Sequence, residues 1–211
     1  MDRWIGWKYC IIHFCIEVVC FWLLCYRLPL GIAWVVSVLY DVVAFAPQGL
    51  FGAFIIKHRE LPYELFGHLF MLIGIPLILS VSIPLAILGY TGLAIGNAIL
   101  HVCGAISTVA DGEGKAFPSA LFVGGGAFGV ITGKTLGELG LPVILLVAFL
   151  AVSLILCLTT KKSLRREKYP EYHQVNEGIR LEVVLFVALL VTAVRGFVGY
   201  AIPIYWKIEI G

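Results

Sequence analysis

Seven long apolar stretches constrain the fold of this chain more than any other feature of its sequence. A helix crosses a bilayer core of about 30 Å with ~20 apolar residues. The stretches of about this length cover residues 9–26, 32–56, 65–81, 85–109, 117–136, 141–159 and 181–206. Hydrophobic residues make up 61% of the chain and charged residues 13%, whereas soluble domains carry about 25% charged residues. The sequence therefore predicts an all-α polytopic membrane protein with seven transmembrane helices in a lipid bilayer.

The polar breaks between these stretches divide the chain into three parts. The longest break contains KKSLRREKYPEYHQ and separates the first six helices from the seventh. We therefore expect a six-helix transmembrane bundle at 1–160, a basic cytoplasmic loop at 161–180, and a seventh helix at 181–211. Pro47 and Pro76 fall inside the second and third stretches, where proline is expected to kink a helix.

The distribution of Lys and Arg predicts a cytoplasmic N-terminus and places the end of this chain outside. In this orientation eleven of the 15 basic residues are cytoplasmic, three are outside, and Arg195 lies in the membrane. The eleven are Arg3, Lys8, Lys57, Arg59, Lys115, Lys161, Lys162, Arg165, Arg166, Lys168 and Arg180. Such a bias is typical of the cytoplasmic side of a plasma or inner membrane protein. The net charge of only +2 gives no indication of a nucleic-acid partner.

Polar side chains inside the apolar stretches are the candidate functional residues, because such groups are costly in lipid and usually face a cavity or a partner. The candidates for solute or ion binding are His13, Glu17, Asp41, Gln48, Asn97, His101 and Arg195. The pairs on the first, second and fourth stretches are four or seven residues apart, so each pair is expected on one helix face. At 1.5 Å per residue their depths also agree. We expect these six residues to converge on one water-accessible cavity.

Two of the carboxylates and the arginine have expected roles. Glu17 and Asp41 are the candidate carriers of a coupling proton or cation, since carboxylates at membrane depth commonly serve this purpose in transporters. Arg195 is expected to act as a counter-ion for one of them or as a clamp for an anionic group of the solute. The sequence leaves both roles of Arg195 open.

Other interpretations of the polar residues also stay open. Each residue alone would fit a structural hydrogen bond between helices. A metal site at His13, Glu17 and His101 would lack the close local spacing of familiar zinc motifs, so we expect no metal and no cofactor. His58 and His68 flank the short segment after the second stretch and are expected in solvent or at the membrane interface.

Three glycines form a stripe on the fifth stretch. Gly125, Gly129 and Gly133 recur every four residues and share one helix face. Small residues at this spacing allow two helix backbones to approach closely. The pattern predicts close helix packing, either static or as a sliding contact in a transporter.

Four segments resemble one transporter family. They read HFCIE at 13–17, GNAILH at 96–101, EGKAFPSALFVGGGAFG at 113–129 and LVTAVRGFVGYAIPIYW at 190–206. With them, nearly the whole chain is similar to the major facilitator superfamily in its fosmidomycin-resistance-like branch. The resemblance implies an N-terminal six-helix bundle followed by the first helix of an incomplete second bundle. It also implies that the first, fourth and seventh helices line a central cavity with His13, Glu17, Asn97, His101 and Arg195.

Two family motifs depart from the usual pattern. The loop after the second helix keeps glycines and the basic residues Lys57 and Arg59 but lacks the aspartate of the gating motif. The glycine-rich fifth helix resembles an antiporter motif without its usual proline. The inward gate and proton antiport are therefore the least secure implications of the resemblance.

The predicted function is secondary active transport of a small solute by alternating access, coupled to protons or other cations, and not an enzymatic activity. Alternating access rocks one bundle against another around a shared site. The chain is therefore expected to be a fragment or half of the full transporter that needs the missing second bundle or a second copy. The alternatives are an intramembrane enzyme that uses His13, Glu17 and His101, and a non-transporting seven-helix scaffold.

Reporter fusions test the orientation. Alkaline phosphatase joined after Gly140 is expected to be active, because that turn is predicted to lie outside. The same enzyme joined after Lys162 is expected to be inactive, and a green fluorescent protein at the same two positions should give the opposite pattern. Phosphatase activity at Lys162 and none at Gly140 would reverse the predicted orientation.

Overall fold

The computed structural model describes residues 4–26, 33–112, 116–159 and Leu190, and these residues are helical apart from short turns. The helices are α1 (Ile5–Tyr26), α2 (Ala33–Phe45), α3 (Gln48–Lys57), α4 (Tyr63–Ile78), α5 (Ile83–Gly112), α6 (Ala116–Glu138) and α7 (Ile144–Thr159). Apart from Leu190 they belong to one compact unit, Met1–Pro170. The predicted basic loop, Arg195 and the rest of the predicted seventh helix lie outside the described residues.

The first six predicted membrane helices have counterparts in the structure. Four segments are long and apolar enough to cross a membrane, namely Ile5–Cys25, Val35–Lys57, Ile83–Ala110 and Phe117–Glu138. The third and sixth predicted helices correspond to α4 and α7, which are apolar but only 16 residues long. At 1.5 Å per residue each reaches about 24 Å. The length and hydropathy of these helices make the chain an integral membrane protein.

The two prolines act differently. The second predicted helix is divided at Ala46 and Pro47, where a turn separates α2 from α3. Proline has no N–H group and its ring clashes with the preceding turn, so a break here is the outcome expected of Pro47. Pro76 lies inside α4, and the helix continues through it for two residues before it ends at Ile78.

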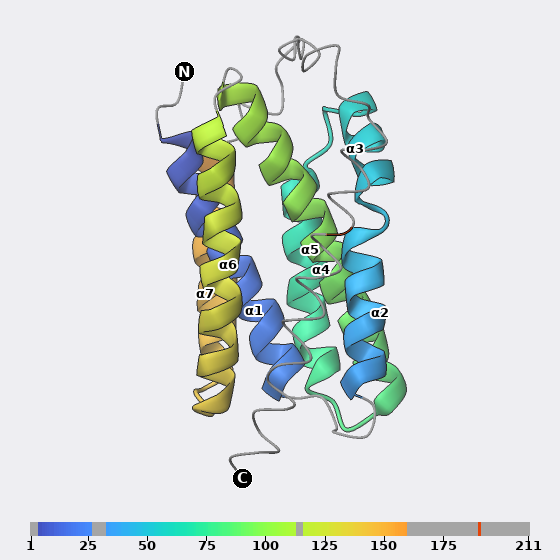
Figure 1. The fold of residues 1–211 in the computed structure, drawn as a ribbon. Helices are drawn as coiled ribbons and strands as arrows, with labels where there is room; N and C mark the ends of the chain where they lie inside the picture. The colour runs from blue at the N-terminus through green and yellow to red at the C-terminus, as the bar shows by residue number, and fades with distance from the viewer. Residues whose placement is uncertain (1–3, 27–32, 113–115, 160–189, 191–211) are drawn as a thin grey trace. The chain divides into compact units, whose positions relative to one another are not determined.

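α1 and α5 are the helices around which the others pack. α1 packs against α6, α7 and α5, while α5 also contacts α2, α3, α4 and α6. Figure 1 shows α6 and α7 beside α1, and α2, α3 and α4 near α5. The core between them contains Ile12, Ile16 and Val19 of α1, Leu93 of α5 and Leu146 of α7. A helix such as α1, surrounded on several sides, has to be apolar over most of its circumference.

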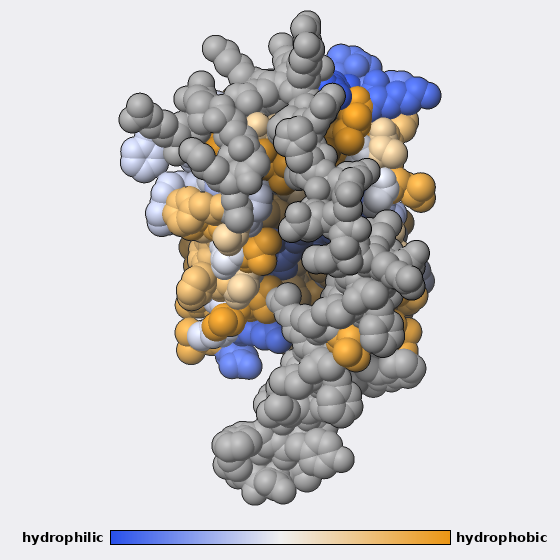
Figure 2. All heavy atoms as spheres, turned by 45° about the horizontal axis from the view of Figure 1, so that its top comes forward, coloured by the Kyte–Doolittle hydropathy of each residue, from blue (hydrophilic) through white to orange (hydrophobic). Residues whose placement is uncertain are grey.

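The outward faces of the helices carry large apolar side chains. Val42 of α2, Ile73 of α4, Ile131 of α6 and Ile155 of α7 are each more than half exposed. Figure 2 shows hydrophobic side chains over most of the described surface on that side of the molecule. Such a surface is unfavourable in water but matches the apolar interior of a bilayer.

The glycine stripe of α6 lies against α1. A Cβ added at Gly129 would lie 2.5 Å from the Phe14 carbonyl oxygen, closer than real Cβ atoms approach such an atom. The glycines and the carbonyl groups they face are Gly125 with Cys10, Gly129 with Phe14 and Gly133 with Val18. Each step of four residues along α6 matches a step of four along α1 in the same direction. The two helices therefore run parallel, with their backbones in direct contact.

A second glycine contact, which was not among the sequence predictions, joins α4 to α5. A Cβ on Gly96 would lie 2.6 Å from the carbonyl oxygen of Gly67, and one on Gly89 would lie 2.8 Å from that of Gly74. A step of seven residues forward on α4 matches a step of seven backward on α5, so these two helices are antiparallel. The seven-residue spacing of glycines on both helices is the signal that would have predicted this contact.

Two neighbouring glycines on α6 test the α1–α6 contact. Gly125→Ala is expected to destabilise the folded protein by about 1–3 kcal/mol, because the new methyl group overlaps the backbone of α1 at Cys10 and the helices have to separate. Gly124→Ala has open space at its Cβ and should be neutral or slightly stabilising. Thermal unfolding of both variants in the same detergent measures the difference, and equal melting temperatures would contradict the contact.

Candidate functional site

Polar residues from α1 and α5 meet between the two helices. On α1, His13 and Glu17 are four residues apart and share one face. On α5, Asn97 and His101 have the same spacing. The Asn97 amide nitrogen donates a hydrogen bond of 3.2 Å to Glu17 Oε1. The same Glu17 oxygen lies 3.4 Å from His101 Nε2 and 3.6 Å from His13 Nε2. These four residues are called the polar cluster below.

The polar cluster is buried near the middle of both helices. Glu17 is 4% exposed and Asn97 is 1% exposed. The side chain of His101 is 14% exposed, so it is the member through which the cluster is open to its surroundings. An ionisable group at this depth is expensive unless neighbouring groups compensate it. Here the groups around the Glu17 carboxylate are His13 on its own helix and Asn97 and His101 on α5.

The two histidines point their Nε2 atoms at each other, 2.7 Å apart. Their other ring nitrogens contact backbone carbonyls: His13 Nδ1 lies 2.7 Å from the Phe122 oxygen and His101 Nδ1 lies 3.1 Å from the Asn97 oxygen. A carbonyl oxygen only accepts hydrogen bonds, so each Nδ1 has to donate its hydrogen there. In the neutral rings both Nε2 atoms then carry lone pairs. Two nitrogen atoms that point lone pairs at each other across 2.7 Å repel. A shared proton or a metal ion bound by both nitrogens would remove this repulsion.

A third helix contributes Tyr40 to the same region. The Asn97 amide nitrogen donates a second hydrogen bond, of 2.7 Å, to the Tyr40 hydroxyl. This tyrosine is 2% exposed and belongs to α2. Tyr40 was not among the predicted site residues, because tyrosine is common in apolar stretches and the adjacent Asp41 is the stronger polar candidate.

α6 supports the cluster from the side of α1. The His13 ring stacks on Phe122, with ring centroids 4.3 Å apart and an angle of 23° between the planes. It also lies against Gly126, where an added Cβ would overlap the ring. At Gly129 the added Cβ would lie 2.8 Å from the Cβ of Glu17. The glycine-rich face of α6 thus leaves room for both polar side chains of α1.

The structure brings together four of the seven predicted site residues: His13, Glu17, Asn97 and His101. The other three are Asp41 and Gln48, which come from the second stretch, and Arg195, which lies outside the described residues. Asp41 is half-buried on α2. Gln48, the first residue of α3, donates a hydrogen bond of 2.9 Å to the Ala44 carbonyl near the end of α2. Their seven-residue spacing assumed one continuous helix, but the turn at Pro47 interrupts it.

His68 is buried, contrary to the expectation that it lies in solvent or at the membrane interface. It is 4% exposed, and its Nε2 lies 2.8 Å from the Ser153 hydroxyl oxygen of α7. Its Nδ1 lies 2.7 Å from the Glu64 carbonyl. The α4–α7 contact accounts for this burial, which proximity to a polar segment in the sequence does not reveal. His58, by contrast, is partly exposed and lies 3.6 Å from Glu60.

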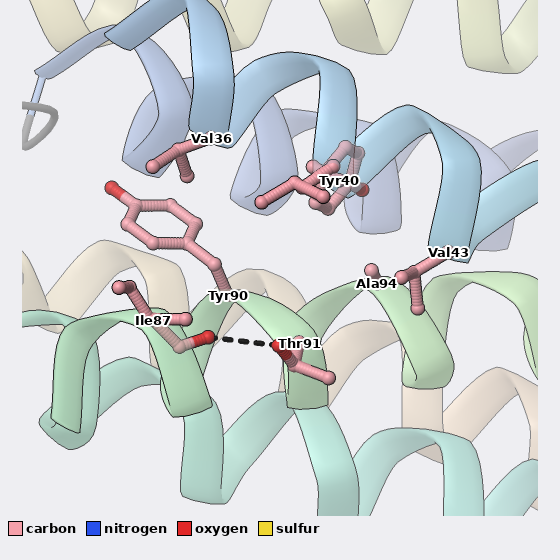
Figure 3. A pocket seen from close by; sticks show the side chains of 8 residues that line it. Val36, Tyr40, Val43, Ile87, Tyr90, Thr91 and Ala94 are labelled. Atoms are coloured by element: carbon pink, nitrogen blue, oxygen red, sulfur yellow. Dashed lines mark hydrogen bonds between the residues drawn. The ribbon is translucent and has the colours of Figure 1, made fainter. Parts of the chain in front are cut away.

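A small apolar cavity of about 100 Å³ adjoins the polar cluster through Tyr40. It lies between α2 and α5, and Figure 3 shows side chains from both helices turned toward it. Its lining residues are Val36, Leu39, Tyr40, Val43, Ile87, Tyr90, Thr91 and Ala94. Drug-sized ligands occupy pockets of about 300–1,000 Å³, so this cavity fits a group of only a few heavy atoms.

Comparisons with family models, with curated proteins and with solved structures find no match for this chain. Membership of the major facilitator superfamily therefore stays a prediction from the sequence. The chemistry of the site has to be inferred from its own geometry. That geometry is a buried carboxylate and two imidazoles whose Nε2 atoms point toward one another.

Asn97 and Thr91 provide a matched test of the polar cluster on α5. Asn97→Leu removes the amide that donates to Glu17 and should destabilise the protein by about 1–3 kcal/mol, because a buried carboxylate loses a donor. Thr91→Val removes a hydroxyl that bonds only to Ile87 in its own helix and should change stability by less than about 0.5 kcal/mol. Unfolding by titration with a denaturing detergent compares the two, and an equal effect would show that the Asn97–Glu17 bond contributes nothing specific.

Proposed function

We propose that this protein is a secondary active transporter that moves a small solute across the membrane by alternating access and couples this movement to a cation at the polar cluster. The observation that carries the proposal is the convergence of His13, Glu17 and His101 near the middle of two membrane helices. Ionisable groups at this depth commonly mark the paths of protons, ions or solutes.

The composition of the cluster favours a cation-binding role over simple helix packing. A structural contact between α1 and α5 needs one donor and one acceptor, which Asn97 and Glu17 already supply. The two imidazoles add nothing to that bond, and their Nε2 atoms face each other unfavourably without a cation. The partial exposure of His101 gives a cation a route to the site.

Transport would require more than the helices described above. Alternating access needs two bundles that move around a site near the bilayer midplane. We therefore propose that the six-helix bundle works with a partner bundle, which is either a second copy of this chain or another half of the transporter. The predicted orientation, with a cytoplasmic N-terminus, and the predicted role of Arg195 belong to the same proposal.

One rival interpretation uses the same residues. An intramembrane enzyme would employ His13, Glu17 and His101 as acid–base groups or with a metal. A transporter leaves its solute chemically unchanged, whereas an enzyme converts its substrate into a product. Recovery and chemical analysis of the solute after the assay below separates the two.

Glu17→Gln tests the transport function in everted membrane vesicles that contain the full chain. The vesicles are energised, a pH-sensitive dye reports the proton gradient, and a panel of small solutes that includes fosmidomycin is added in turn. At least one solute is expected to discharge the gradient with the natural protein. We expect this response to fall at least tenfold with Glu17→Gln, because the coupling carboxylate is lost.

His68→Gln is the matched control, since His68 is equally buried but bonds to Ser153 on α7. It should retain most of the response. A solute response that is the same with Glu17→Gln as with the natural protein would refute the role of the polar cluster in transport. If none of the solutes in the panel discharges the proton gradient, the result argues against proton-coupled transport of these solutes.

A further inference from the structure

We propose that His13, Glu17 and His101 form a binding site for a divalent transition-metal ion of the zinc class. Each residue offers one ligand atom, and the three atoms lie within 4.8 Å of one another. Two imidazole nitrogens and one carboxylate oxygen are a common set of protein ligands for zinc, with a fourth position left for water or another ligand. The sequence alone favoured no metal, because these ligands come from helices far apart in the chain.

Two of the three separations between the ligand atoms fit a tetrahedral ion closely. Ligands at about 2.0–2.1 Å from zinc stand about 3.3 Å apart in a tetrahedron. Glu17 Oε1 is 3.4 Å from His101 Nε2 and 3.6 Å from His13 Nε2. The two Nε2 atoms are closer, at 2.7 Å, so the imidazoles have to part by roughly 0.6 Å to reach that tetrahedral separation. Rotation of the partly exposed His101 ring is sufficient for so small a change.

The surroundings of the two histidines are those of metal ligands. Histidines that bind a metal almost always donate their other ring N–H to a carbonyl or carboxylate, which fixes the tautomer with the free electron pair toward the ion. His13 donates to the Phe122 carbonyl and His101 to the Asn97 carbonyl. The Asn97 side chain also holds Glu17 by a hydrogen bond. All three ligands are thus oriented before any ion arrives.

A second observation points to a fourth ligand. The side-chain oxygen of Asn97 is buried and has no hydrogen-bond partner among the residues that the structure describes. Buried polar atoms are rarely left in this state. A water molecule on the fourth position of the ion would be a natural partner for this oxygen.

The ligand set selects the kind of ion. Imidazole suits zinc and its transition-metal neighbours, whereas calcium and magnesium prefer sites made of oxygen atoms only. The site therefore discriminates against the two divalent ions that are most abundant in cells. That such an ion is the transported or coupling cation rests on the proposed function, whereas the binding site itself does not.

Cobalt(II) is the probe for the binding site, because tetrahedral cobalt has strong visible absorption bands. The full chain is purified in detergent, stripped of metal with a chelator and titrated with Co²⁺. We expect one Co²⁺ per chain with tetrahedral bands that Zn²⁺ abolishes and that excess Mg²⁺ and Ca²⁺ leave unchanged. His101→Gln and His13→Gln should each weaken binding by about 100-fold or more, since even the loss of a ligand's supporting partner costs about 10–100-fold.

Three further variants make the result specific. His101→Cys should bind Co²⁺ and gain an intense sulfur-to-cobalt band in the near ultraviolet. This new band would show that the ion lies beside residue 101 by a gain of signal, not only by a loss of binding. His58→Gln removes the exposed histidine beside Glu60, and His68→Gln removes a buried histidine outside the cluster. Neither should change binding. The site is refuted if no Co²⁺ binds, if binding survives the loss of both cluster histidines, or if His58→Gln abolishes it.

Uptake of radioactive zinc by liposomes that contain the full chain separates this inference from the proposed function. Binding with uptake that Glu17→Gln abolishes supports a metal cargo. Binding without uptake keeps the metal site and argues against metal as the cargo. Transport of another solute by a protein that binds no Co²⁺ refutes the metal site and leaves transport intact.

Discussion

The direct contact between the backbones of α1 and α6 is the constraint on which the arrangement of the site depends. Gly125, Gly129 and Gly133 bring α6 against α1, and this contact sets which face of α1 is covered and which is turned to α5. Lipid tails are as apolar as the side chains of these helices, so helix association in a bilayer relies on close packing rather than on the exclusion of water. Together with the direct contact of α1 with α5, this packing holds His13 and Glu17 opposite Asn97 and His101.

The polar cluster shows how a buried carboxylate is accommodated in an apolar bundle. Glu17 receives a hydrogen bond from Asn97 and has two imidazoles within 3.6 Å. The hydrogens of those imidazoles are engaged by backbone carbonyls on their far sides. The centre of the cluster is therefore rich in lone pairs and poor in hydrogens. This deficit distinguishes it from an ordinary interhelical hydrogen bond and is the observation on which the proposed cation site rests.

The sequence predicted the helices and the inward faces of α1 and α5 well, because apolar length and four-residue spacing are local properties. His13, Glu17, Asn97 and His101 could be selected from the chain alone. Their mutual distances could not, since these depend on how α6 supports α1. The turn beside Pro47 changes the phase between Asp41 and Gln48, which their seven-residue spacing alone does not reveal. Tyr40 was not selected and the expectation for His68 was wrong, because burial by a distant helix leaves no mark on the nearby sequence.

The antiparallel contact between α4 and α5 has a mechanical consequence. With Gly67 against Gly96 and Gly74 against Gly89, the hairpin is clamped at two points seven residues apart and resists both sliding and scissoring. α1 and α6 form the other clamped pair. The polar cluster lies where these two pairs meet, so its hydrogen bonds and the proposed ion would join one pair to the other.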